Sequence, residues 1–299
     1  ATHAPCDRMP TGCWTRSPPS VLGELRARIG QSPDIDEDRR PMTEPSQPDS
    51  LTAEIGFRIG DEPVNMKVTV PRGLIDATRI LPLAHAVTNL VVDGSTRLHG
   101  QTVRCSKGCG ACCRQLVPIT TLEARALAEH VANAPVERRE RWESRYADAQ
   151  QRLDAAGLTG VLSNLGSLDA GQANALGHRY FELGIECPFL EDGACSVHAV
   201  RPAICREYLV TSDPVHCANP TPQTVARVPV PTRVSAALAT LARQTEPGQP
   251  FPWLALPLAP RWLQAHPDLP PRPGPELLRE LFEALGKAPI EPPPGLGSG

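Results

Sequence analysis

Residues 105–113 read CSKGCGACC and place four cysteines within nine residues of one another. Four more follow at wider spacing, so that eight of the ten cysteines lie from residue 105 to residue 217. A tight turn that carries several thiols, closed by thiols from distant chain, is how proteins build thiolate metal sites. We therefore predict that these eight bind metal: Cys105, Cys109, Cys112, Cys113, Cys187, Cys195, Cys205 and Cys217.

The first cysteine group also carries two glycines and a cysteine pair. We expect Gly108 and Gly110 to take positive φ and to let backbone amides approach the sulfurs. The adjacent Cys112 and Cys113 are expected to point apart. Either the two serve different metals, or one is a ligand while the other packs or reacts. Eight thiolates are therefore compatible with two four-sulfur sites and with one site plus spare thiols.

The composition of the 299-residue chain excludes several classes of protein. A net charge of −3 argues against a general nucleic-acid binder. No stretch approaches about 18 consecutive apolar residues, so we expect no membrane span. The N-terminus lacks the charged-then-apolar layout of a secretory signal, which predicts a cytoplasmic protein. There, clustered cysteines more often bind metal or do redox chemistry than form structural disulfides.

The same cysteines are compatible with other kinds of site. A purely structural zinc site is a serious rival, because spacing alone does not identify the metal. The first three cysteines have the spacing of radical S-adenosylmethionine enzymes, but Ala111 stands where an aromatic residue is usual and no recurring βα units follow. His198 and His216 lie beside cysteines and could be ligands, although a surface position is the simpler interpretation.

Proline indicates how the chain is organised, since 22 of the 34 prolines lie in the first 50 and last 54 residues. We expect a disordered leader over residues 1–50. The metal-binding domain is predicted over residues 51–265, with its cysteine core at 100–220. A Pro-rich tail with one short helix is expected over residues 266–299.

Hydrophobic periodicity predicts the first elements of the domain. Apolar residues alternate with polar ones over residues 55–59 and 64–70, which predicts a β-hairpin. A helix is expected to start near Pro82, which suits a first turn, and to fade near Gly94 or Gly100.

Helices are predicted after the first cysteine group as well. Thr120 and Glu123 form a capping box for a helix that runs to about residue 133. Residues 159–178 are rich in Gly, Ser, Asn and Ala and have no clear assignment. Other helices are expected over residues 136–156, 233–243 and 276–285.

The cysteine pattern resembles the YkgJ-type cysteine cluster proteins, a family of zinc- or iron-chelating domains. That family's motif ends in a cysteine pair, and the triplet Cys109, Cys112 and Cys113 fits it, while Cys105 lies one residue further out. The second half is also similar, with CPFL at 187–190, GACSV at 193–197, RP at 201–202 and CREY at 205–208. The resemblance covers roughly residues 100–220 and implies a metal or iron–sulfur site on about eight cysteines.

We therefore predict an α+β fold that is mainly helical and loop-rich, with a small β-hairpin and helices around a cysteine-bound metal centre. The resemblance slightly favours an iron–sulfur cluster over zinc. One alternative is an enzyme that uses the centre, either a protein-modifying methyltransferase of the flagellin lysine N-methylase type or an oxidoreductase. Another is an interaction or assembly protein that zinc folds. The sequence identifies no reaction, substrate or partner.

Overall fold

The computed structural model describes residues 49–59, 62–106, 108–221, 223–248 and 252–287. Within these ranges the chain is mainly helical, and its strands form two-stranded antiparallel sheets, so the predicted α+β fold is confirmed. The predicted leader lies outside the described residues except for Asp49 and Ser50. No described helix combines the length and the apolar character needed to cross a bilayer.

The β-hairpin predicted from alternation is confirmed. Its strands are β1 (Ser50–Ile59) and β2 (Glu62–Pro71), paired so that Ile55 lies opposite Met66. Ile55, Phe57 and Ile59 are buried, whereas Glu54 and Arg58 are exposed and Gly56 is half-buried. One face of the hairpin thus covers helices, as period-two burial requires.

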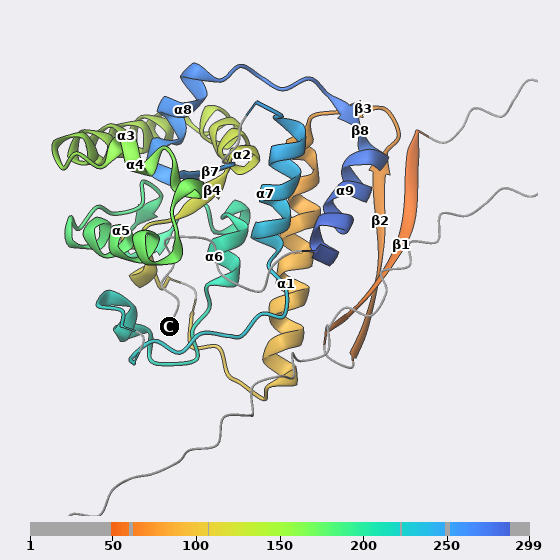
Figure 1. Ribbon diagram of the computed structural model, residues 1–299, viewed down its shortest axis with the longest axis horizontal. Coiled ribbons are helices and arrows are strands. Elements are labelled where there is room, and N and C mark those ends of the chain that lie inside the picture. Colours follow the sequence, from red (N-terminus) through yellow and green to blue (C-terminus); the bar gives the residue numbers. More distant parts are fainter. Residues whose placement is uncertain (1–48, 60–61, 107, 222, 249–251, 288–299) are drawn as a thin grey trace, which may run out of the picture.

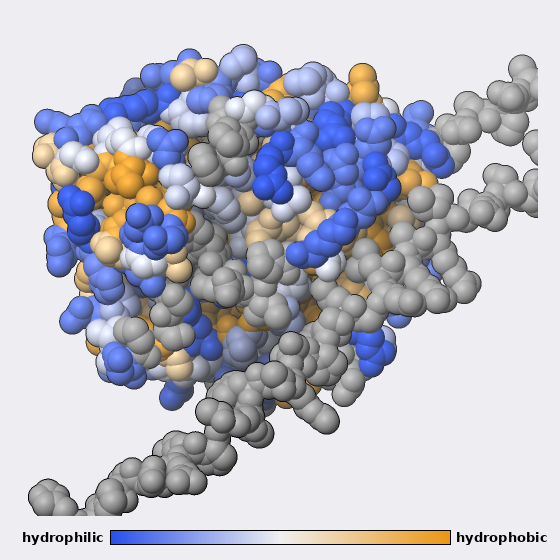
Figure 2. All heavy atoms as spheres, in the orientation of Figure 1, coloured by the Kyte–Doolittle hydropathy of each residue, from blue (hydrophilic) through white to orange (hydrophobic). Residues whose placement is uncertain are grey.

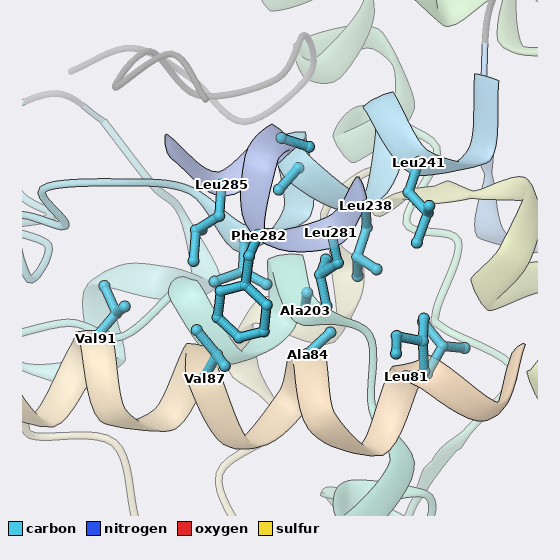
Figure 3. Close-up of a cluster of buried hydrophobic side chains, with 14 of the residues drawn as sticks. Leu81, Ala84, Val87, Val91, Ala203, Leu238, Leu241, Leu281, Phe282 and Leu285 are labelled. Atoms are coloured by element: carbon cyan, nitrogen blue, oxygen red, sulfur yellow. The ribbon is translucent and has the colours of Figure 1, made fainter. Parts of the chain in front are cut away.

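Three helices form the main core behind this hairpin: α1 (Leu81–Leu98), α7 (Val234–Thr245) and α9 (Gly274–Lys287). In Figure 3 the apolar face of α1 points toward side chains from the other two helices. Figure 1 shows the three helices side by side, with β2 next to α9 and β1 outermost. The labelled side chains of this core include Leu81, Ala84, Val87, Val91, Leu238, Leu241, Leu281, Phe282 and Leu285.

The end of α1 agrees with the sequence prediction, whereas packing extends past the predicted end of the domain. The helix α1 runs through Gly94. A Cβ at this position would lie 2.5 Å from Ile59 Cδ1, so the glycine permits close packing of the helix on the hairpin. It ends at Leu98, before Gly100 with φ of +58°. The helix predicted over 276–285 is α9, whose apolar face belongs to the main core, so packing continues across residue 265.

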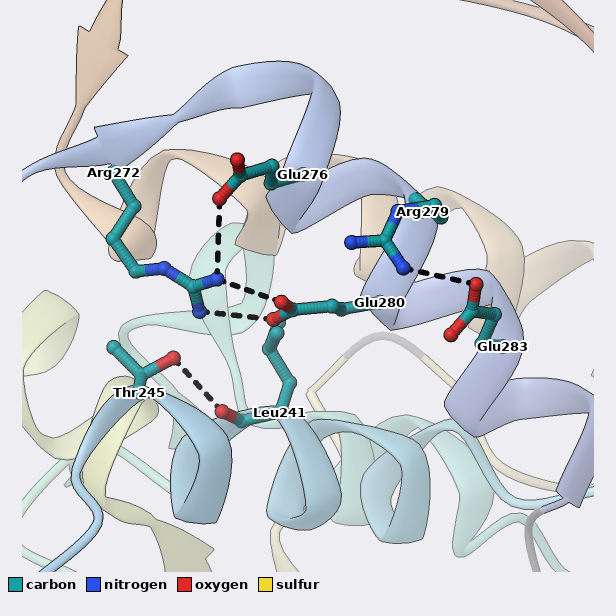
Figure 4. Close-up of polar contacts among 7 residues, drawn as sticks. All are labelled: Leu241, Thr245, Arg272, Glu276, Arg279, Glu280 and Glu283. Atoms are coloured by element: carbon teal, nitrogen blue, oxygen red, sulfur yellow. Dashed lines mark hydrogen bonds and ion pairs between the residues drawn. The ribbon is translucent and has the colours of Figure 1, made fainter. Parts of the chain in front are cut away.

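The start of α9 is held by a short sheet and an ion-pair network. Strand β8 (Arg272–Pro273) pairs with β3 (Leu74–Ile75). Arg272 donates two hydrogen bonds to Glu280, at 2.6 and 2.9 Å, and pairs with Glu276 at 3.6 Å (Figure 4). Figure 2 shows that hydrophilic residues cover this exposed face of the helix.

The other half of the molecule is helical too and packs around aromatic residues. The helices α2 (Thr121–Ala132) and α3 (Val136–Ala155) occupy the predicted ranges, and both hydrogen bonds of the predicted capping box are present. Trp142 and Tyr146 on α3 meet Phe189 edge-on, with ring centroids 5.3 and 5.7 Å apart. This contact joins α3 to the second cysteine group.

The segment without a clear assignment also contains helices, α4 (Thr159–Leu162) and α5 (Ala170–Glu182). Asp169 and Gln172 form a capping box at the start of α5. The remaining described elements are α6 (Ala203–Glu207), α8 (Ala259–Ala265), β4 (Pro118–Thr120), β5 (Leu190–Glu191), β6 (Ala194–Cys195), β7 (Trp253–Ala255) and the 3₁₀ helices η1 (Ala77–Ile80), η2 (Ala111–Arg114), η3 (Leu165–Ser167), η4 (His198–Val200), η5 (Pro214–Ala218) and η6 (Leu256–Leu258).

Candidate metal centre

The first cysteine group folds into a tight turn around η2. Cys109 N–H donates to Ser106 O at 3.1 Å, and Cys113 N–H donates to Gly110 O at 2.9 Å. Gly108 has φ of +90°, as predicted. The prediction of positive φ for Gly110 is wrong, because its φ is −113°.

Gly110 is instead required by a close approach between the two cysteine groups. A Cβ at this position would lie 2.4 Å from Gly193 O and 2.4 Å from Leu190 Cδ1. Gly193 belongs to the turn between β5 and β6, where Leu190 pairs with Cys195. The glycine therefore lets the turn that carries Cys195 rest on the first group.

A main-chain hydrogen bond joins the two groups directly. Cys187 N–H donates to Cys113 O at 2.7 Å, across 74 residues of sequence. Burial raises the thiol pKa of Cys187 and Cys195, and the backbone N–H groups of Phe189 and Val197 oppose these shifts. Such N–H groups favour the thiolate, the form that binds metal.

The short helix α6, which carries Cys205, is held at both ends by buried carboxylates. Glu123 Oε1 accepts a hydrogen bond from Ala203 N–H at 2.8 Å. Glu207 accepts from Ser235 N–H at 2.9 Å and from the Ser235 hydroxyl at 2.7 Å. Burial raises the pKa of both carboxyl groups, and these donors oppose the shift. Sequence reasoning found the capping role of Glu123 but missed its bond to α6.

The chain after α6 returns to the first cysteine group. Arg104 N–H donates to Val210 O at 2.8 Å, and Val210 N–H donates to Cys105 Sγ at 3.4 Å. Further on, η5 packs against η2 and carries the buried Cys217. All eight predicted ligands therefore lie on segments that contact one another.

The prediction that Cys112 and Cys113 point apart is wrong. Their thiols interact with each other, which lowers the pKa of Cys112 to about 7 and raises the pKa of Cys113. Burial opposes the shift at Cys112, while the Arg201 guanidinium adds to it. The one-turn 3₁₀ helix brings the neighbouring side chains to one side, a geometry that the residue order alone does not show.

The charge of Cys112 raises the thiol pKa of several other cysteines. Burial is the largest cause that raises the thiol pKa of Cys217, to about 11, and of Cys187, to about 12, and the charge of Cys112 adds to both shifts. Burial also raises the thiol pKa of Cys105, Cys195 and Cys205, and Cys112 again contributes.

The remaining thiol interactions divide the cysteines into two sets. In the first set, Cys105 and Cys109 each raise the thiol pKa of Cys217, and Cys109 raises that of Cys105. In the second set, Cys187 raises the thiol pKa of Cys113 and Cys205, and Cys195 raises that of Cys187 and Cys205. We call these the first set (Cys105, Cys109 and Cys217) and the second set (Cys113, Cys187, Cys195 and Cys205).

The eight cysteines are free thiols rather than disulfides. Within the described ranges, no three His, Cys, Asp or Glu side chains stand close enough together to hold one ion as they are placed. The side chains of His198 and His216 are exposed. The N-terminal Cys6 and Cys13 lie outside the described residues.

A surface hollow of about 510 Å³ adjoins the first set. Cys109 and Ala111 line it together with Asp192 and Val215. Arg114, on the same wall, donates to Glu186 at 2.6 Å. This hollow could not be predicted from local sequence patterns, because its walls come from segments that are far apart in the chain.

Comparison with known families agrees with this geometry. The family model described as "CxxCxxCC: Putative zinc- or iron-chelating domain" matches residues 104–223, a range that contains all eight cysteines. No curated protein and no solved structure matches the chain. The resemblance predicted from the cysteine pattern is thereby confirmed.

Proposed function

Because residues 104–223 form a domain of the CxxCxxCC zinc- or iron-chelating family, we propose that this chain binds such a metal on its eight clustered cysteines. One observation carries the proposal: Cys187 N–H bonds Cys113 O at 2.7 Å, and so two cysteine groups that are distant in sequence meet at the adjacent pair. Cysteines that only pack in a core would not require two distant groups of thiols to meet in this way.

The donor atoms fit a thiophilic metal. Thiolates suit zinc and iron–sulfur clusters, whereas magnesium and calcium prefer carboxylate and carbonyl oxygens. The two buried carboxylates nearest to Cys205, those of Glu123 and Glu207, already accept hydrogen bonds from helix N-termini. Arg201 favours the thiolate form of Cys112 and Cys195. A thiolate centre is therefore the chemistry that these residues support.

We place two four-thiolate sites in this region. Cys112 completes the first set, and Cys113 already belongs to the second set, so that the adjacent pair divides between the two sites. Metal binding would draw the thiols of each set together. The loops that carry most of these cysteines can move for this more easily than long helices can. A metal held in this way would supply either folding energy, as zinc does, or electron transfer, as an iron–sulfur cluster does.

Of the two metals we favour an iron–sulfur cluster. The bond from Val210 N–H to Cys105 Sγ supports this, because such bonds tune the potential of a cluster as well as stabilising thiolates. The backbone N–H groups of Phe189 and Val197 likewise favour the thiolates of Cys187 and Cys195. Zinc with a purely structural role, in an interaction or assembly protein, is the alternative that the same thiols allow.

The deciding experiment is anaerobic purification followed by analysis of iron, zinc and acid-labile sulfide. An iron–sulfur protein is brown and releases sulfide on acidification. Colourless protein with stoichiometric zinc, from cells grown with ample iron, would favour the structural alternative. Protein that carries neither iron nor zinc after anaerobic purification, even from cells grown with ample iron, would contradict the proposal.

The hollow beside Cys109 favours a second candidate, an enzyme that uses the centre. A cavity of about 510 Å³ next to one thiolate set is large enough to admit part of a substrate. A protein-modifying methyltransferase or an oxidoreductase would use such access, whereas a folding site needs none. Loss of activity in Val215→Glu, with metal content unchanged, would support the enzyme.

A further inference from the structure

The strand β1 forms an outer edge of the hairpin. Figure 1 shows β2 lying between β1 and α9, with β1 at the margin of the molecule. In the part of the chain that the structure describes, β2 is the strand that pairs with β1, and the opposite edge of β1 has no partner strand. This edge is ten residues long and contains no proline.

The two prolines of β2 identify which backbone groups face that edge. Proline has no N–H, so it occupies the pairs of an antiparallel ladder that exchange no hydrogen bonds. Pro63 lies opposite Arg58 and Pro71 lies opposite Ser50. These β1 residues therefore direct their N–H and C=O groups away from β2, and so does every second residue between them.

The two edges of the hairpin consequently differ. The outer edge of β2 presents Pro63 and Pro71, which cannot donate, and prolines of this kind protect a strand from further pairing. The outer edge of β1 presents five residues that can all donate and accept: Ser50, Thr52, Glu54, Gly56 and Arg58. Its inward side chains are apolar and carry no charge that would oppose pairing.

The charges on this edge are arranged symmetrically. Glu54 and Arg58 are both exposed and lie two residues to either side of Gly56. We propose that β1 pairs with β1 of a second copy of this chain, antiparallel and centred on Gly56. A two-fold axis at Gly56 places Glu54 of each copy directly opposite Arg58 of the other.

In this register, side chains on both faces of the joined sheet lie opposite favourable partners. On the outer face, Glu54 already pairs with Lys67 at 3.2 Å, so a ladder of alternating charge would run across the joined hairpins. On the inner face, Ile55 of one copy lies opposite Phe57 of the other, which extends the apolar surface. A register with the axis at Glu54 would place Glu54 of one copy opposite Glu54 of the other, and the repulsion between these like charges disfavours it.

The test is sedimentation equilibrium of the full chain, with two charge reversals. We expect the wild type to dimerise with rising concentration. Glu54→Lys alone and Arg58→Glu alone should each weaken the dimer at least about tenfold, because each opposes like charges at two symmetric places. An equimolar mixture of the two variants should dimerise again, because every cross-strand pair is then opposite in charge.

Matched controls place the same charge changes far from the hairpin. Glu140→Lys on α3 and Arg179→Glu on α5 are exposed and should dimerise as the wild type does. A wild type that stays monomeric at every concentration would overturn the proposal, including the case in which residues 1–48 fill the edge. A dimer that neither reversal weakens, or a mixture that fails to restore it, would overturn it equally.

Discussion

Glu123 accepts a hydrogen bond from Ala203 N–H at 2.8 Å, and thereby ties the first turn of α2 to the helix that carries Cys205. The same carboxylate accepts from Thr120 N–H at 2.9 Å as part of the capping box. One buried carboxylate thus caps two helices that lie 80 residues apart in sequence. The position of Cys205 therefore depends on Glu123, which is not one of the predicted metal ligands.

Replacing this carboxylate should disturb the cysteines as well as the fold. In Glu123→Gln one of the two oxygens becomes an amide N–H₂ group, which faces N–H donors and leaves a buried donor unpaired. We expect the free energy of unfolding to fall by about 1–3 kcal/mol and metal content to fall with it. Urea unfolding and metal analysis measure the two effects. The exposed Glu129→Gln, on the same helix, should change neither.

His85 should make stability depend on pH. Burial, aided by Arg206, lowers its pKa from 6.5 to about 4. Between these values the unfolded chain binds a proton that the folded chain refuses, so the contribution of His85 is present above pH 6.5 and is lost as pH falls toward 4. Allowing for the part of the ring that water reaches, we expect a loss of about 1–2 kcal/mol.

Unfolding by urea at pH 7 and pH 5 measures this loss, and His85→Asn should reduce the difference. Since acid also protonates the cysteines, the comparison is between variants at the same pH. The exposed His178→Asn should keep the full pH dependence. Equal pH dependence in wild type and His85→Asn would contradict the assignment.

The sequence predicted what local patterns encode. Alternation located the hairpin, the Thr120 and Glu123 box located α2, and cysteine spacing located the segments that converge. The helix α5 was not predicted because its Gly and Asn residues have low helix propensity, although the Asp169 and Gln172 box and the apolar face of Ala173, Leu176 and Tyr180 were present.

Long-range contacts explain the remaining differences. The role of Gly110 depends on Gly193, and the inclusion of α9 in the core depends on α1 and α7. Neither partner lies near enough in sequence to leave a periodic signal. The contact between the thiols of Cys112 and Cys113 depends on a 3₁₀ turn, which the glycine-rich surroundings do not specify.

Gly110→Ala should separate the two cysteine groups. The added methyl would lie 2.4 Å from Gly193 O, and this backbone atom can move only if the β5–β6 turn moves with it. We expect a loss of about 1–3 kcal/mol in stability together with reduced metal content. Gly160→Ala, where a Cβ meets no atom within 4 Å, should retain both. Normal metal content in Gly110→Ala would show that the close approach is dispensable.

The adjacent pair gives the sharpest test of two sites. If Cys112 completes the first set and Cys113 the second, Cys112→Ser and Cys113→Ser should each remove about half of the metal, and the double variant should remove nearly all of it, since a structural thiolate site usually needs four ligands. Metal analysis of anaerobically purified protein measures this. Cys6→Ser and Cys13→Ser, outside the matched domain, should keep full metal content. Complete loss in either single variant would indicate one shared centre, and unchanged metal in both would remove the pair from the ligand set.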